Sequence, residues 1–417
     1  MAEPIRSENN MTSYPNMKLI PHERKMLVLL LLSTILIYPN SPSGGLSYLP
    51  HLLLGIIAVY AIAKIPVIKP AYSFLFFANY MMISSFLFSS IYSEGIINVF
   101  ISSMRLFFPF LAMIVGGLLR SKIKVKSLLG ILLFLLLMEF VVVFLQINNS
   151  EFRALSYNIY RANNSADRLL ASFIYSTGQR GIGTIGNPNS LGIFVIALNS
   201  AILILSNTYS KKLIRNILNA LCISVTTYIV INSQSRTAAI LLVVTIGVII
   251  YWKLTNRSKS KLIMLIISIF PAIWLLNMIQ AEISRDISLV ALDTRFEVWQ
   301  MLISEMYDHA SYSDIFVSIF GVGYHTARSW GFYDNIYLKV FVSAGIVGIL
   351  VFLGTIISIH KSMVKMANNE FKQLAAILVL IWLATSMVVE FQEIFKIAAF
   401  NFILIGYALY PDKGKES

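Results

Sequence analysis

Three arginines of this sequence stand where a polypeptide can bind a phosphate or another anion. Arg180 belongs to the stretch QRGIGTIGNPNSLG (179–192), while Arg236 and Arg295 each fall in the predicted first turn of a helix. A guanidinium group offers several N–H donors in one plane, and the start of a helix offers unbonded N–H groups and a positive dipole end. The pattern therefore predicts an anion-binding site. A glycine hinge that leads into an apolar helix is the alternative for 179–192.

Polar residues cap the predicted helices beside these arginines. Asn187 suits the N-cap of one helix, with Asn189 in its first turn, and Ser235 suits the N-cap of a second helix. Asp334 or Asn335 caps a third. One such helix start is an ordinary structural feature. Three that face the same side predict a shared site.

Long apolar segments must position these residues. Apolar residues make up 57% and charged residues 13% of the 417 residues, against roughly 45–50% and 25% in soluble proteins. A membrane span needs about 20 mostly apolar residues, and the sequence holds about twelve such segments. They are 26–40, 48–63, 71–91, 96–119, 127–147, 188–206, 216–232, 237–252, 262–280, 335–359, 372–389 and 392–410. The sequence predicts an all-α polytopic integral membrane protein with a single membrane domain over 1–417.

The distribution of lysine and arginine orients the predicted spans. An even number of spans puts both termini on one side, and the segments on that side carry most of the basic residues. By the positive-inside rule this side is the cytoplasm. The formal net charge of +13 then reflects topology, and nucleic acid is excluded as a partner.

Function is expected on the outer face, because the two long loops, 148–187 and 281–334, lie there. The basic residues of the outer segments are all arginines, whereas those of the inner segments are mostly lysines. The outer arginines are Arg153, Arg161, Arg168, Arg180, Arg236, Arg285, Arg295 and Arg328. Pairing with nearby acidic residues is the alternative to binding of a phosphate or carboxylate ligand.

The second long loop contains a predicted amphipathic helix, DTRFEVWQMLISEMY (293–307). Thr294 and Glu297 have the spacing of a capping box. Its apolar side chains recur at helical spacing: Phe296, Trp299, Ile303 and Met306. We expect this helix to lie at the outer membrane interface; a purely structural lid is the alternative.

Arg105 and Glu139 are ionisable residues inside predicted spans. Each lies about eight residues from the outer end of its helix, which is a depth of roughly 12 Å. Because buried charges are costly and generally paired, the two are predicted to pair with each other or to line the outer half of a cavity. Arg328 and Asn335 are further candidates to line it. A structural ion pair is the alternative.

Nothing in the spacing of the five histidines or of the acidic residues predicts a metal site or a cofactor. The one cysteine, Cys222, lies in an apolar run, which excludes a disulfide framework and a thiolate cluster. If the bound anion is a diphosphate, arginines must neutralise it.

Together these motifs resemble the O-antigen polymerase (Wzy) family, within the superfamily of O-antigen polymerases and O-antigen ligases. The matching pieces are RGIGTIGNPNSLG, SQSRTAAI, DTRFEVW and GVGYHTARSWGFYDNIYLKVFVSAGIVG, in family order and with a large outer loop before the last piece. They cover roughly residues 180–350. Each piece alone is weak, whereas the ordered set is more specific.

The resemblance implies a glycosyltransferase of the bacterial inner membrane that acts at the periplasmic face without a metal. Such an enzyme moves a growing glycan from undecaprenyl diphosphate onto the next lipid-linked repeat unit, with inversion. Arg180, Arg236 and Arg295 match arginines expected to hold the lipid diphosphate, with Asn187 and Asn189 nearby. Fixed guanidinium groups would stabilise the charge that develops on the leaving diphosphate.

The resemblance leaves the general base open. The ligase branch has a His-Asn pair where this sequence has Asp334 and Asn335, which favours the polymerase branch. Asp334 is then the first candidate for the base and His325 the second; a plain N-cap is the alternative role of Asp334. Whether a separate chain-length regulator is a partner stays open.

Two other functions compete with polymerisation. One is ligation of the finished glycan to a lipid A core, and the other is transport of the lipid-linked sugar. Transport predicts charged residues along a path through both leaflets. Here the charged residues within or beside the spans fall in the outer half or at its edge, which disfavours transport: Arg105, Glu139, Lys339, Glu390, Glu393 and Lys396.

Overall fold

The computed structural model describes residues 49–89, 95–160, 180–209, 211–253, 290–308, 314–329, 335–386 and 395–411, together with the single positions Leu32, Leu36 and Tyr38. Every regular element within these ranges is a helix, which confirms the predicted all-α class. The predicted span 262–280 and nearly all of 26–40 lie outside the described residues.

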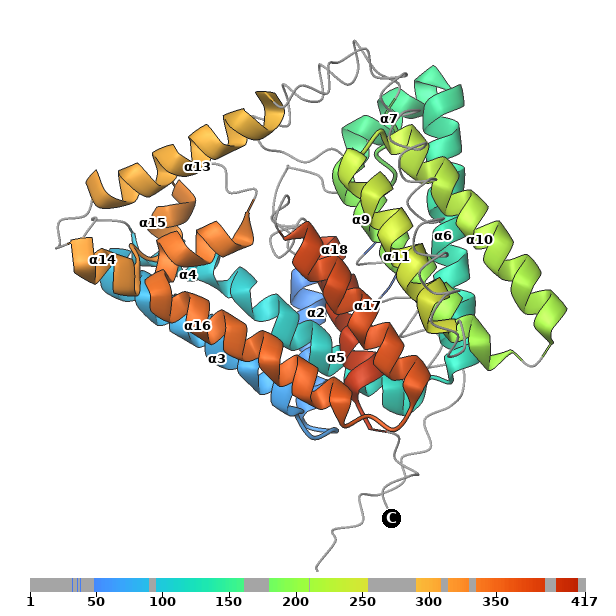
Figure 1. Cartoon of the computed structure of the whole chain (residues 1–417), viewed down its shortest axis with the longest axis horizontal. Helices are drawn as coiled ribbons and strands as arrows, with labels where there is room; N and C mark the ends of the chain where they lie inside the picture. Colours follow the sequence, from blue (N-terminus) through green and yellow to red (C-terminus); the bar gives the residue numbers. More distant parts are fainter. Residues whose placement is uncertain are drawn as a thin grey trace, which may run out of the picture.

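The helices are labelled in Figure 1. In chain order they are α2 (Leu49–Ile62), α3 (Lys69–Ser89), α4 (Ile96–Met104), α5 (Phe108–Lys122), α6 (Val125–Asn148), α7 (Ser150–Tyr160), α9 (Pro188–Leu205), α10 (Lys212–Ser233), α11 (Arg236–Lys253), α13 (Val290–Asp308), α14 (Asp314–Phe320), α15 (Tyr324–Ser329), α16 (Ile336–Val364), α17 (Asn369–Thr385) and α18 (Phe395–Leu409). Short 3-10 turns follow α4 (Arg105–Phe107) and α9 (Ser206–Thr208).

Six helical segments of the described residues are long and apolar enough to cross a membrane. They are Lys69–Phe88, Ile96–Lys122, Val125–Asn148, Pro188–Thr208, Lys212–Ser233 and Ile336–Val364. Three apolar helices are shorter: Leu49–Ile62, Arg236–Trp252 and Phe395–Leu409. These helices support an integral membrane protein. Apart from the two spans outside the described residues, each predicted span overlaps a described helix, or two successive helices in the case of 96–119. That twelve spans cross the membrane stays a prediction.

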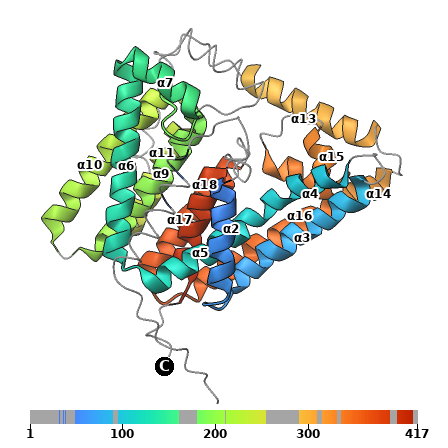
Figure 2. The ribbon, with the colours of Figure 1, turned by 180° about the vertical axis from the view of Figure 1, so that it is seen from behind.

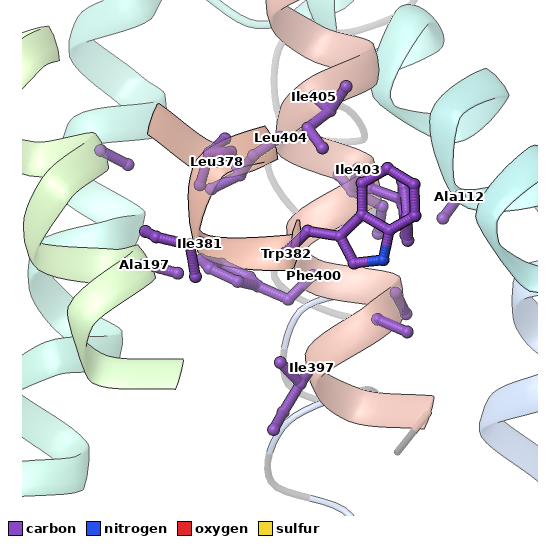
Figure 3. Packing of buried hydrophobic residues seen from close by; sticks show 14 of the residues in the cluster. Ala112, Ala197, Leu378, Ile381, Trp382, Ile397, Phe400, Ile403, Leu404 and Ile405 are labelled. Atoms are coloured by element: carbon purple, nitrogen blue, oxygen red, sulfur yellow. The ribbon is translucent and has the colours of Figure 1, made fainter. Parts of the chain in front are cut away.

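Two groups of helices flank α17 and α18 (Figures 1 and 2). The first group contains α6, α9, α10 and α11, and the second contains α3, α4 and α16. Figure 3 shows the core around Trp382 of α17, with Ile403 of α18 and Ala112 of α5 beside it. α9 and α18 are buried over almost their whole lengths, so these two helices fix the positions of the residues at their ends.

α5 and α18 pack backbone against backbone at two glycines. A Cβ atom at Gly116 would lie 2.0 Å from the carbonyl oxygen of Ile403, and a Cβ atom at Gly406 would lie 2.1 Å from that of Met113. Small residues of this kind let membrane helices approach closely. A larger side chain at either position would push α18 away from α5.

Two predicted spans are interrupted in the structure. Pro109, near the start of α5, has no N–H for the carbonyl of Arg105, and the chain forms a 3-10 turn there instead. Gly345 breaks α16, with φ 61° and ψ −157°, a conformation open mainly to glycine. The predicted spans 96–119 and 335–359 therefore each consist of two helical pieces, although each remains one apolar segment long enough to cross a membrane.

The break in α16 receives the segment between α14 and α15. The N–H groups of Val322 and Gly323 donate to the carbonyls of Val342 and Ser343, both at 2.9 Å. These bonds satisfy carbonyls that the interrupted helix leaves without a partner. They also fix the start of α15, the helix that carries His325.

We call the two ends of the helix bundle the arginine end and the lysine end. The arginine end holds the last turns of α6, α10 and α17 and the first turns of α9, α11, α16 and α18. Helix ends meet there: the Gly181 N–H donates to the Asn232 carbonyl, and the Ile336 N–H to the Ser386 carbonyl, each at 2.8 Å. The lysine end is the opposite one, where α6, α10 and α17 begin and α5, α16 and α18 end.

α13 lies across the arginine end near α14 and α15 (Figure 1). Leu302 and Met306 are buried against residues of α14, α15 and α16, so the apolar side of this helix contacts other helices. The predicted capping box is wrong, because α13 begins at Val290 and Thr294 lies inside it. No glycine or proline stands between 290 and 294 to stop the helix from extending past the expected cap.

Candidate functional site

Polar N-caps begin three helices at the arginine end, as predicted. Asn187 Oδ1 accepts hydrogen bonds from two N–H groups of the first turn of α9, at 2.9 and 3.2 Å. Ser235 Oγ accepts one from the Ala238 N–H at 3.3 Å. Asn335 is the cap of α16, where its Oδ1 accepts two N–H groups at 2.9 and 3.2 Å. These N–H groups of the first turns therefore already have acceptors within the protein, although the sequence analysis expected them to be available to an external anion.

Backbone N–H groups of the glycine-rich stretch 180–187 donate hydrogen bonds to side chains of α6. The N–H groups of Ile182 and Gly183 both donate to Gln146 Oε1 at 3.0 Å. The N–H of Thr184 donates to Glu139 Oε2, also at 3.0 Å. These N–H groups therefore bind side chains of the protein. Non-helical backbone inside a membrane protein needs such internal partners.

Glu139 is fully buried, about 13 Å from the arginine end of α6 at 1.5 Å per residue. The N–H and the hydroxyl group of Thr184 both donate to its carboxylate. Lys396 of α18, also buried, donates to the carbonyl of Thr184 at 2.8 Å and to that of Leu36 at 3.3 Å. Thr184 thus bridges a buried carboxylate and a buried ammonium group. Opposite charges in one network lower the cost of burying each of them.

Lys396, and not Arg105, is the cation that acts on Glu139. Among the described residues no ion pair joins Arg105 to Glu139, so their predicted pairing is wrong. Arg105 lies in the 3-10 turn between α4 and α5. Both residues were expected at a similar depth in the membrane, but depth alone does not say which helices are neighbours. The signal for Lys396 was a lysine at the edge of a span, which resembles an ordinary interfacial residue.

The guanidinium group of Arg180 closes the end of α10. Its Nε donates to the Ser233 carbonyl at 2.9 Å, and its Nη2 to the Gln234 carbonyl at 3.3 Å and to Asn189 Oδ1 at 3.5 Å. Helix C-terminal carbonyls attract a cation in this way. Arg180 is half-buried, and Arg236, also half-buried, follows Gln234 by two residues. The structure thus places Arg180 against the turn that leads into Arg236.

Tyr157 of α7 holds the backbone of Arg180. Its hydroxyl group donates to the Arg180 carbonyl at 3.2 Å. Burial raises the pKa of Tyr157 to about 12, opposed by the weaker effects of Arg180 and Arg153. Arg153 closes α6 as Arg180 closes α10, with bonds of 2.6 and 2.7 Å to the carbonyls of Gln146 and Ile147.

His325 lies in the second helix group, at the contact of α15 with α4. Its Nδ1 is 2.9 Å from Ser102 Oγ. The hydroxyl group of Ser102 donates to the Val99 carbonyl at 3.0 Å, so we assign the proton of this contact to Nδ1. That tautomer leaves the lone pair of the imidazole on Nε2. An imidazole held in this way has the chemistry of a general base.

Lys339 of α16 is a buried cation near this histidine. Only 4% of its side chain is exposed, and its Nζ lies 5.0 Å from the ring centre of Tyr324. The Tyr324 N–H is itself fixed by Ser85 Oγ at 2.8 Å. Because Tyr324 and His325 are consecutive, Lys339 belongs to the same neighbourhood. The sequence showed Lys339 only as a charge near the edge of a span.

Several predicted site residues fall outside this description. Asp334 lies outside the described residues. The backbones of Arg295 and Arg328 lie in α13 and α15, and their side chains are outside the description. The charged side chains buried in the described part of the chain are Glu139, Lys339 and Lys396, and all three lie toward the arginine end.

Comparison of the sequence with models of known protein families and with curated proteins finds no match.

Proposed function

We propose that the chain is a membrane glycosyltransferase that polymerises lipid-linked oligosaccharide repeat units at the arginine end. The observation that carries this proposal is the position of Arg236. It begins α11 and is half-buried, although a cation at the start of a helix is opposed by the helix dipole. A bound anion would reverse that disadvantage. Arg180, beside the same turn, would supply a second guanidinium group for a diphosphate.

The hydrogen bonds that the backbone N–H groups already make limit which groups can bind the diphosphate. Because Gln146, Glu139 and the N-caps accept those N–H groups, the guanidinium groups alone are assigned to the diphosphate. The network of Glu139, Thr184 and Lys396 would act as a support that fixes the loop carrying Arg180. Binding groups that need no rearrangement stabilise developing charge best.

In the proposed reaction, a sugar hydroxyl of the acceptor forms a bond to the anomeric carbon of the donor glycan. The bond from that carbon to the lipid diphosphate breaks, and the diphosphate leaves with the electron pair beside Arg236 and Arg180. The hydroxyl proton passes to a base, for which the described residues offer His325 Nε2. His325 belongs to α15, which lies beside α4 of the other helix group (Figure 2), so the proposal requires the acceptor glycan to reach across the arginine end. Asp334 stays the alternative base.

The test is the length of the surface glycan in a deletion strain that carries single variants. We expect Arg236→Gln to reduce the ladder of repeats to a single repeat attached to the lipid A core, and Arg236→Lys to restore it in part. Arg153→Gln is the control for loss of a half-buried arginine at the same end of the bundle. Arg153 closes α6 as Arg180 closes α10, and it is not assigned to the substrate. Protein levels in the membrane are measured for every variant.

The same strains separate the competing functions. Loss of all glycan from the core, without a single repeat, would identify a ligase. Normal ladders in Arg236→Gln at normal protein level would refute the proposed role of Arg236. Accumulation of lipid-linked repeats on the cytoplasmic side would instead point to a transporter.

A further inference from the structure

A cavity of about 1370 Å³ lies at the lysine end, between α16, α17, α18 and the start of α3. Its charged lining residues are four cations and one carboxylate: Lys69, Arg120, Lys361, Lys365 and Glu370. The volume exceeds the roughly 300–1,000 Å³ of common small-molecule pockets. A cavity of this size and charge suits a large anionic group. It lies at the opposite end of the bundle from Arg180 and Arg236.

Arg120 is the fixed cation of this cavity. Its guanidinium carbon lies 3.7 Å from the ring centre of Phe371 and 5.2 Å from that of Tyr407. Both rings are buried, so the guanidinium plane is held by packing. Cation–π contacts of this kind fix an arginine before a ligand binds. The exposed side chains of Lys361 and Lys365 add mobile charge from the last turns of α16.

The cations of the cavity, and not the start of α17, are the groups that would attract an anion. Asn368 caps α17, and its Oδ1 accepts the N–H groups of Glu370 and Phe371 at 2.9 and 3.1 Å. The first turn of α17 therefore has an internal partner. Glu370 repels an anion, but the four cations outnumber it.

An exposed apolar stripe runs along α16 into the cavity. Ile346, Leu350, Leu353 and Ile357 are between 45% and 61% exposed, and their spacing puts them on one side of the helix. Ile357 also lines the cavity, one turn before Lys361. α16 is long and apolar enough to cross a membrane. The stripe would accommodate an acyl chain, which a free phosphate ion does not have.

We propose that this cavity binds the headgroup of an anionic phospholipid, with the phosphate near Arg120, Lys361 and Lys365 and an acyl chain along the stripe of α16. Basic pockets between membrane helices have the chemistry that recognises anionic lipid headgroups. The proposal is independent of the proposed glycosyltransferase function, since it concerns the opposite end of the bundle.

The test is native mass spectrometry of the full-length protein in detergent, titrated with phosphatidylglycerol or with phosphatidylcholine. Lys361→Gln combined with Lys365→Gln removes two cations of the cavity. Lys211→Gln combined with Lys212→Gln is the matched control, because these exposed lysines start α10 at the same end and do not line the cavity. Each lysine near an anionic headgroup contributes on the order of fivefold in affinity, so we expect the cavity variant to bind phosphatidylglycerol about 25-fold more weakly. The control variant should bind like the unmodified protein.

Three outcomes would overturn the proposal. The first is equal loss of phosphatidylglycerol in both double variants, which would reveal a general effect of surface charge. The second is equal binding of phosphatidylglycerol and phosphatidylcholine. The third comes from a parallel titration with inorganic phosphate: if the cavity variant loses phosphate binding but keeps phosphatidylglycerol binding, the occupant is a free phosphate. Thermal melts confirm that both double variants are folded.

Discussion

Replacing Glu139 by glutamine removes one buried charge while nearly keeping the shape of the side chain. Glutamine retains an oxygen that can accept the Thr184 N–H, and its amide can donate to Thr184 Oγ. The Thr184 hydroxyl group can still donate to the Leu36 carbonyl, to which it lies at 2.9 Å. What the variant loses is the negative charge that acts on Lys396. Glu139→Gln therefore measures the charge and not the hydrogen bonds.

The expected cost follows from what each variant leaves unpaired. Removing one partner of a buried ion pair typically costs about 3–5 kcal/mol, and Lys396 keeps two carbonyl acceptors, so we expect about 3 kcal/mol for Glu139→Gln. Lys396→Met removes the donor of the Thr184 and Leu36 carbonyls and also leaves the buried charge of Glu139 without its cation, at about 3–5 kcal/mol. With both changes no charge is left unpaired. The double variant should therefore be more stable than the sum predicts by about 1–3 kcal/mol.

The assay is equilibrium unfolding of the purified protein in detergent, followed by near-ultraviolet circular dichroism. A double-mutant cycle of Glu139→Gln and Lys396→Met gives the coupling energy. Lys339→Met provides a matched second cycle with Glu139→Gln, because Lys339 is also a buried lysine near the arginine end but contacts Tyr324. We expect additive effects in this second cycle. Additive effects in the first cycle as well would refute the bridge through Thr184.

Three further variants test the loop, the break in α16 and the tyrosine of α7. Gly183→Ala should destabilise the protein by about 1–3 kcal/mol, because φ is 56° and the new Cβ would lie 2.3 Å from Glu139 Oε2; chemical unfolding checks this. Gly345→Ala should lower the melting temperature, since φ is 61° and its Cβ would meet the Ile319 carbonyl at 2.3 Å. Tyr157 has its pKa raised to about 12, so its contribution to stability is complete below pH 10 and declines as the pH rises toward 12. The melting temperature of Tyr157→Phe should therefore decrease less between pH 10 and pH 12 than that of the unmodified protein.

The helices of this protein could be predicted from local sequence patterns. Long apolar segments gave the spans, and residues such as Asn187 and Ser235 gave the helix starts, because an N-cap depends only on the next two or three residues. The same local rule failed at Thr294, where a good cap sequence lies inside α13. Local capping preference is worth about 1 kcal/mol, and continued helix with a buried apolar side outweighs it.

The partners of the buried residues could not be predicted, because they come from helices distant in the sequence. Glu139 meets Thr184 and Lys396 across three separate parts of the chain. A similar depth in the membrane suggested Arg105, but depth fixes only one of the three coordinates of a side chain. The acceptors of the loop 180–187 could not be predicted for the same reason, because they lie on α6. The Gly183 N–H donates to the neutral amide of Gln146, and it is Thr184, beside it, that donates to the carboxylate of Glu139.

The internal partners of that stretch make Arg236 a sharper test of function than Arg180. Arg180 has a structural role at the end of α10, so its replacement affects folding and binding together. Arg236 starts α11 against the helix dipole, and Ser235 already caps that helix. Without substrate, Arg236→Gln should therefore stabilise the protein by about 0.3–1 kcal/mol. A variant that is more stable and yet makes no polymer would assign the arginine to its ligand, whereas a less stable variant would assign it to the fold.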